Sequence, residues 1–132
     1  MNIYTETEYD IIHEINVDFI LRPVPREIHI VQYDKTLPIV KVNLFNNGQK
    51  YLLPNDATVN VRFGWPGKIE VNKPILGWNE DRNIVYFAVD ENMTNIKGKF
   101  GADLEIVLSN NHGCSSPILI TIDGNPVKKQ QL

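Results

Sequence analysis

The chain has 132 residues with 13 basic and 16 acidic side chains, and its formal net charge is −3. This length suits one domain, and the single cysteine, Cys114, cannot form a disulfide within it. The basic residues form no stripe, which argues against nucleic-acid binding. No run approaches the roughly 20 apolar residues of a membrane span, and the N-terminus lacks the features of a signal peptide. We expect a protein made in the cytoplasm without a signal peptide, with no nucleic-acid or membrane partner.

The first half of the chain predicts strands, because apolar and polar residues alternate with a period of two. In the first of them, residues 11–19, the alternation places His13 on the apolar side. Prolines at 23 and 25 end this strand, since proline cannot continue a ladder of hydrogen bonds. The Asn47-Gly48 pair predicts a tight turn between later strands. The predicted strands in this half are residues 11–19, 27–33, 36–44 and 58–65.

The second half continues the pattern with further strands and one short helical segment. Pro66-Gly67 predicts a hairpin turn into a strand over residues 69–75. Residues 77–83 are polar and predict a connection, and residues 90–97 are long enough for only one helical turn. The remaining predicted strands are residues 84–89, 100–108 and 117–122.

Seven to eight short strands with no amphipathic helix predict an all-β fold, either an antiparallel β-sandwich or a barrel, and the sandwich is preferred. We expect an antiparallel β-sandwich of about 7–8 strands, immunoglobulin-like in general architecture, whose two sheets bury their apolar faces against each other. The predicted domain spans residues 1–123. Residues 124–132 carry no pattern and are interpreted as a polar tail or the start of a linker.

Five motifs follow one another along the chain in a specific order. They are VQYDKT (31–36), KVNLFNNGQ (41–49), LPNDATVNVRFGWPGK (53–68), GKFGADLEIVLSN (98–110) and SSPILITI (115–122). Each is weak alone, but in this order and spacing they cover nearly the whole chain. Together they resemble the N-terminal domain of the phage baseplate upper protein family, known from tailed phages and prophages of Gram-positive bacteria.

The resemblance implies a structural role in the virion. Proteins of this family sit on the tail baseplate, pack by this domain against the tail core and carry or support the receptor-binding parts. The implied partners are other baseplate and tail proteins and further copies of the chain, and the implied location is the tail baseplate, after synthesis in the host cytoplasm.

The titratable residues do not predict an active site. His13, His29 and His112 fall in different predicted elements, and His112 with Cys114 supplies two metal ligands at most. The acidic pairs at 80–81 and 90–91 lack the alternating oxygen ligands of a calcium loop. We therefore expect no catalytic residue, no metal and no cofactor, and a protein that is not an enzyme.

Three aromatic residues are candidates for partner binding. Trp65 continues the apolar face of its strand, and Tyr33 ends the second predicted strand. Trp78 stands in the polar connection, where we expect it to be exposed. An exposed tryptophan also stacks on sugars, so the alternative function is a carbohydrate-binding β-sandwich that recognises cell-wall saccharide. An immunoglobulin-like adhesion module is weaker, because paired cysteines are missing.

Overall fold

The fold is taken from a computed structural model of the whole chain, which describes residues 3–22, 26–34, 38–64, 71–95 and 97–127. These residues form eleven strands and one four-residue helix. The elements are β1 (Ile11–Asp18), β2 (Glu27–Val31), β3 (Pro38–Asn46), β4 (Gln49–Lys50), β5 (Thr58–Gly64), β6 (Val71–Pro74), β7 (Gly77–Trp78), β8 (Ile84–Ala88), α1 (Glu91–Thr94), β9 (Gly98–Val107), β10 (His112–Cys114) and β11 (Ile118–Asp123).

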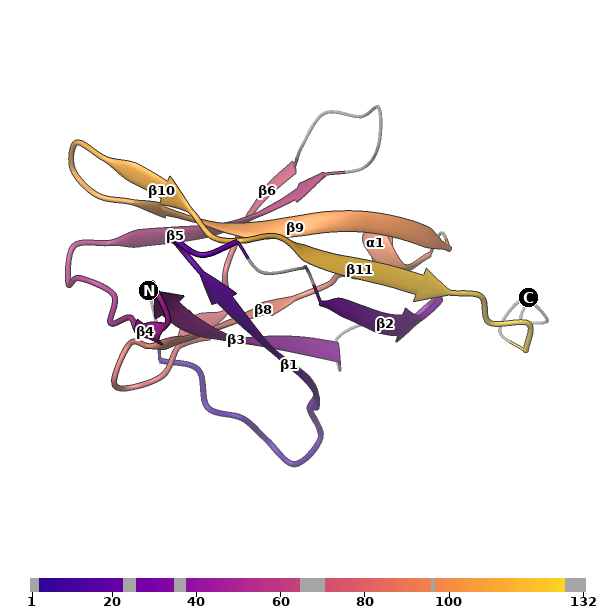
Figure 1. Cartoon of the computed structure of the whole chain (residues 1–132). Helices are drawn as coiled ribbons and strands as arrows, with labels where there is room; N and C mark the ends of the chain where they lie inside the picture. The colour runs from indigo at the N-terminus through magenta and orange to yellow at the C-terminus, as the bar shows by residue number, and fades with distance from the viewer. Residues whose placement is uncertain (1–2, 23–25, 35–37, 65–70, 96, 128–132) are drawn as a thin grey trace.

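The strands form two sheets that pack as a β-sandwich, as predicted. The five-stranded sheet has the order β1-β3-β8-β7, with β4 paired to β3. The six-stranded sheet has the order β2-β11-β9-β5-β6, with β10 paired to β9. Figure 1 shows the two layers, with β9 and β11 above and β3 and β8 below.

The sheets are mixed, which differs from the purely antiparallel sandwich expected. β1 pairs with β3 in parallel, from Ile11 with Pro38 to Asp18 with Phe45, and β2 pairs with β11 in parallel. The chain leaves the five-stranded sheet after β1, enters the other sheet as β2 and returns as β3. This crossover is the kind of connection that parallel neighbours require.

The core lies between the sheets and is built by the predicted alternation. The inward residues of β3 and β5 have at most 1% of their surface exposed. The rings of Phe63 and Phe87 meet edge to face with centroids 5.7 Å apart, and Phe100 lies 6.0 Å from Phe63. Such pairs add to the free energy gained from burying the rings. The inward residues of β3 and β5 that are at most 1% exposed are Val40, Val42, Leu44, Val59, Val61 and Phe63.

Several local predictions are confirmed. Asn47 and Gly48 have φ values of 54° and 82°, as a two-residue hairpin turn requires. β5 and β6 pair as the predicted hairpin, although its turn lies outside the described residues. The helical turn appears as α1. The strands β4, β7 and β10 were not predicted, because two or three residues are too few to show a period. Within the described part of the chain, no helix is long and apolar enough to cross a membrane.

The segment before β1 lies across the outer face of the five-stranded sheet, where Figure 1 shows it as the loop beneath the sheet. Ile3 forms a bridge with Trp78, and the Tyr4 ring lies 4.9 Å from the Tyr86 ring. The Glu6 carboxylate accepts a hydrogen bond from the Tyr86 hydroxyl at 2.6 Å and binds Lys41 at 2.9 Å. This segment therefore covers a sheet face that would otherwise be open.

Candidate interaction surfaces

Trp78 is buried, so the prediction that it is exposed is wrong. It belongs to β7, which pairs with β8, and only 7% of its surface is exposed. Its carbonyl accepts a hydrogen bond from the Tyr4 N–H at 2.9 Å, and the Arg82 guanidinium lies 4.1 Å from the ring centroid. The polar neighbours in sequence suggested an exposed loop, but Trp78 is part of a strand and of the core. Trp78 is therefore not available to stack on a sugar.

The other two aromatic candidates have different positions. Trp65 lies outside the described residues. Tyr33 follows β2, is half-buried and has a φ of 76°. Its N–H donates to the Thr94 carbonyl at 2.9 Å, so this backbone position joins the end of β2 to α1. Tyr33 and Trp78 follow or belong to strands of different sheets and do not form one surface with each other.

The histidines and the cysteine do not converge. His13 lies on β1, His29 on β2 and His112 on β10, and no group of three potential metal ligands exists among the described residues. Burial raises the pKa of the Cys114 thiol, which keeps it protonated and poorly nucleophilic at neutral pH. His29 lies 3.0 Å from Asp123 and 3.3 Å from Glu27, and its hydrogen bond to Asp123 raises its pKa. This cluster is exposed and acts as surface charge.

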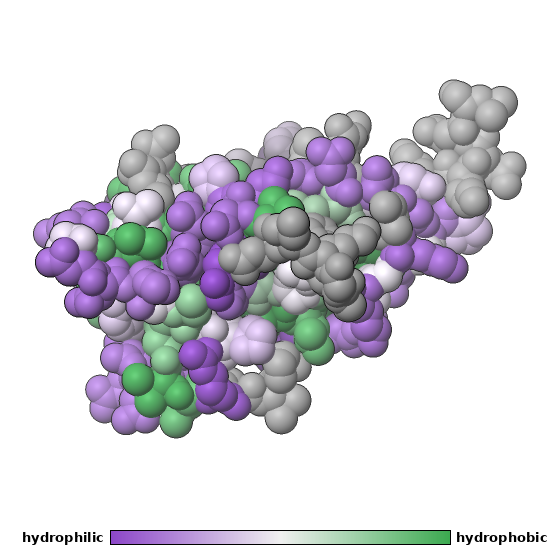
Figure 2. All heavy atoms as spheres, turned by 90° about the horizontal axis from the view of Figure 1, so that it is seen from above, coloured by the Kyte–Doolittle hydropathy of each residue, from purple (hydrophilic) through white to green (hydrophobic). Residues whose placement is uncertain are grey.

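The outer face of the six-stranded sheet is mainly hydrophilic, as Figure 2 shows for the part not covered by grey atoms. Its clearest interaction is the two-pronged pair of Arg62 with Asp103, with N–O distances of 2.8 and 2.7 Å. Each partner is the cross-strand neighbour of the other on β5 and β9. Paired charges of this kind are typical of a solvated sheet face.

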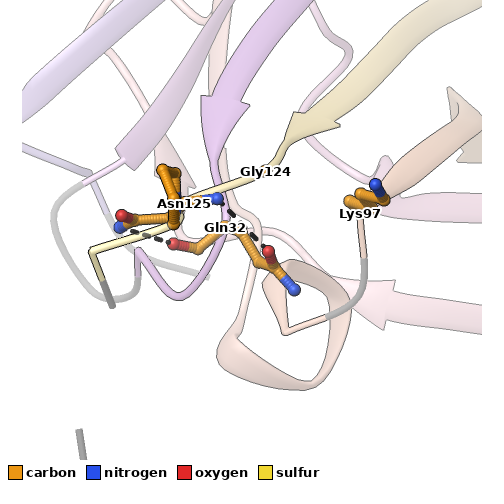
Figure 3. A pocket seen from close by; sticks show the side chains of 5 residues that line it. Gln32, Lys97, Gly124 and Asn125 are labelled. Atoms are coloured by element: carbon orange, nitrogen blue, oxygen red, sulfur yellow. Dashed lines mark hydrogen bonds between the residues drawn. The ribbon is translucent and has the colours of Figure 1, made fainter. Parts of the chain in front are cut away.

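A hollow of about 360 Å³ lies where the chain leaves β11, lined by Gln32, Lys97, Gly124, Asn125 and Pro126. Figure 3 shows Asn125 beside Gln32. The Asn125 N–H donates to the Gln32 side-chain oxygen at 3.3 Å, and the Gln32 amide donates to the Asn95 carbonyl at 2.9 Å. These bonds fasten the residues after β11 to the end of β2, so we interpret the hollow as structural.

An apolar surface occurs at one end of the sandwich, where two exposed residues lie beside three partly buried ones. We call Phe19, Ile20, Leu21, Tyr51 and Leu108 the apolar end. A hollow of about 280 Å³ is lined there by Phe19, Ile20, Tyr51 and Leu108 together with residues of the β9–β10 hairpin. Ile20 is 62% exposed and Leu21 is 48% exposed. Contiguous exposed apolar residues mark contact surfaces more often than single ones do.

Asp18 holds the apolar end in place. The residue is 6% exposed, and its carboxylate accepts hydrogen bonds from the backbone N–H groups of Ile20, Leu21 and Gly48 at 2.8 Å and from that of Asn47 at 3.0 Å. Burial opposes ionisation, but the four donors outweigh it and lower the pKa of Asp18 to about 2. The carboxylate thus joins the end of β1 to the β3–β4 turn.

Sequence reasoning missed this role of Asp18. The alternation placed its side chain on the outer, polar side of β1, and nothing in the pattern indicates that a turn 29 and 30 residues later covers it. The signals that could have found it are the aspartate at the end of a strand and the Asn47-Gly48 turn, whose free N–H groups need acceptors.

The comparisons with known proteins support the fold. No protein-family model and no curated protein sequence matches the chain. Among solved structures, the N-terminal domain of phage TP901-1 ORF48 is similar, with a TM-score of 0.68 over 85% of this chain and 98% of that domain. The sequence identity is 7%, so the likeness is one of fold. At that level it supports the resemblance to the phage baseplate upper protein family predicted from the sequence.

Proposed function

We propose that this chain is a structural component of a tailed-phage or prophage baseplate, where it attaches receptor-binding parts to the tail core. The observation that carries the proposal is the fold shared with 98% of the N-terminal domain of a phage protein. The ordered sequence motifs point the same way. The proposal includes association with other tail proteins and with copies of the chain, and it excludes an enzymatic role.

The physical character of the domain agrees with a supporting role. Two sheets share one apolar core, and the Asp18 carboxylate fixes the turn and the exposed residues at the apolar end. A rigid surface of this kind binds a neighbour without a large loss of conformational entropy. We take the apolar end as the candidate contact with the tail core.

Co-purification tests the proposal. The chain is produced together with the tail proteins encoded beside it, and complexes are separated by size-exclusion chromatography. We expect the chain to elute with a tail core protein, and Ile20→Glu to weaken that association at least about tenfold, because it places a charge in an apolar contact. The matched control is Leu76→Glu, at an apolar residue that is 41% exposed elsewhere on the surface.

Two results would contradict the proposal. One is a chain that binds none of these proteins, and the other is purified virions in which mass spectrometry does not detect it. An unchanged complex with Ile20→Glu would instead reject the apolar end as the contact while leaving the structural role intact.

The carbohydrate-binding alternative is not proposed further. It depended on an exposed Trp78, and this residue is buried in the core with the Arg82 guanidinium over its ring. No other observation on the described residues favours a saccharide.

A further inference from the structure

β1 is a long edge strand that lacks proline and lysine, two residues that often block further pairing. It stands at the end of its sheet with β3 as its one neighbour in the strand order, and its eight residues, IIHEINVD, contain no proline, glycine or lysine. The other described edge strands are shorter. β7 has two residues, β2 has five, and β6 has four that include Lys73 and Pro74. Long edges that lack such blocking features pair readily with another strand.

Hydrogen bonds at the end of β1 show which backbone groups point outward. The Phe19 N–H donates at 3.0 Å to the carbonyl of Phe45, which is the partner of Asp18 in the last β1–β3 pair. The preceding residue, Asp18, directs its N–H and its carbonyl the other way, to Ser116. Because these directions alternate along a strand, the N–H and carbonyl groups of Ile12, Glu14 and Asn16 also point away from β3.

No described residue bonds to these six outward groups, whereas Asp18 is satisfied. Ser116 donates its N–H to the Asp18 carbonyl and accepts the Asp18 N–H on its hydroxyl, both at 3.0 Å. A residue of the connection between β10 and β11 thus already pairs with the outer edge of β1. We call residues 12–16, which precede the contact with Ser116, the open part of the edge.

The open part is acidic. Glu14 is exposed at its centre, and the segment leading into β1 adds Glu6, Glu8 and Asp10. Lys41 is the cross-strand neighbour of Glu14, but its ammonium group binds Glu6 at 2.9 Å. The Glu14 carboxylate accepts a hydrogen bond from the Asn43 amide at 2.8 Å and keeps capacity for a cation.

A second copy of the chain is a poor occupant for this edge. In the symmetric antiparallel register that uses all three open residues, Ile12 faces Asn16 of the copy and Glu14 faces Glu14. Like charges directly opposite each other destabilise a strand pair.

We propose that the outer edge of β1 binds an extended segment of a partner protein by strand addition, with a basic residue of that segment facing Glu14. Backbone hydrogen bonds to residues 12–16 supply the affinity, and Glu14 supplies the selectivity. The inference goes beyond the phage role and does not depend on it, because it follows from the edge of β1 alone.

A peptide selection tests the proposal directly. Random nine-residue peptides are selected for binding to the whole chain, and the recovered peptides are studied with the chain by NMR. We expect peptides enriched in lysine or arginine that slow hydrogen exchange at the amides of Ile12, Glu14 and Asn16 at least about tenfold.

Three variants of the chain test whether the selected peptides bind at the edge of β1. Glu14→Pro removes an outward N–H, which an edge strand tolerates, and we expect it to abolish peptide binding while the spectrum of the fold is kept. Glu14→Gln keeps the edge but removes the charge, and we expect about threefold weaker binding, as for an exposed ion pair. Glu80→Gln, at an exposed carboxylate away from β1, leaves binding unchanged.

Other outcomes overturn the proposal. No recovered peptide, or peptides that protect other amides and still bind Glu14→Pro, would show that this edge is not a strand-addition site. Sedimentation could instead show a dimer that forms with increasing concentration and is more stable in Glu14→Gln. This result would show that a second copy occupies the edge, because removing the charge relieves repulsion between two copies but weakens the binding of a basic peptide.

Discussion

The two parts of β1 differ although they belong to one strand. At its end, Asp18 has its carboxylate held by four backbone donors and its own N–H and carbonyl bound to Ser116. In its middle, Ile12, Glu14 and Asn16 have outward backbone groups that no described residue binds. The difference shows that one edge strand can have its outward backbone groups bound at its end and unbound by the described residues a few positions away.

The largest expected effect comes from removing the Asp18 carboxylate at the end of β1. Asp18→Ala leaves four backbone N–H groups without their acceptor in a buried site, so we expect the melting temperature to fall by about 10 °C. Calorimetry at pH 7 measures the melting temperature. Asn16→Ala, two residues away on the open part, is the control and should change the melting temperature by less than about 2 °C. Equal effects of the two variants would contradict the contrast between the two parts of β1.

Acid should reproduce part of that loss. The pKa of Asp18 is about 2 in the folded chain and about 3.9 for an unperturbed aspartate. A lowered pKa stabilises the fold above the unfolded value, so the contribution is complete above about pH 4 and disappears as the pH falls through 2. Melting temperatures recorded between pH 7 and pH 2 should fall less steeply below pH 4 in Asp18→Ala than in the unaltered chain.

Ser116→Ala tests whether Ser116 stabilises the end of β1. It removes the acceptor of the Asp18 N–H while keeping the Ser116 N–H that binds the Asp18 carbonyl. We expect a loss of about 1 to 3 kcal/mol in the free energy of unfolding, as for a buried donor left without a partner. Urea denaturation measures the loss, and a value below about 0.5 kcal/mol would show that Ser116 does not close the edge.

The smallest effect is expected in the open part. Glu14→Pro removes an N–H that has no partner, so the free energy of unfolding should fall by less than about 1 kcal/mol. His13→Pro is the matched control, since its N–H points to β3 and its loss removes a hydrogen bond between the strands, with an expected cost of about 1 to 3 kcal/mol. If both variants destabilise the chain equally, the assignment of outward groups along β1 is wrong.

Sequence reasoning could predict the parts of the fold that depend on local patterns. The alternation of Val40, Val42 and Leu44 sets one face of β3, and Asn47-Gly48 sets the turn after it, so both are visible in a short window of sequence. The parallel pairing of β1 with β3 is not visible, because it depends on a crossover through the other sheet.

The candidate surfaces were harder to predict because their residues depend on distant partners. Trp78 has polar neighbours in sequence, yet it is part of the core, and Ile3 and Tyr4 pair with its backbone from the start of the chain. Asp18 is held by the turn at Asn47 and Gly48, and Ser116 reaches it from 98 residues away. The open edge of β1 follows only from the order of strands in the sheet.

Amide hydrogen exchange of the isolated chain is the most direct test of the contrast within β1. We expect the amides of Asp18 and Phe19 to exchange at least about a hundredfold more slowly than those of Ile12, Glu14 and Asn16, because the first two are hydrogen-bonded and the last three have no partner among the described residues. Slow exchange at all five positions would mean that the outer edge of β1 is already covered, and would contradict this expectation.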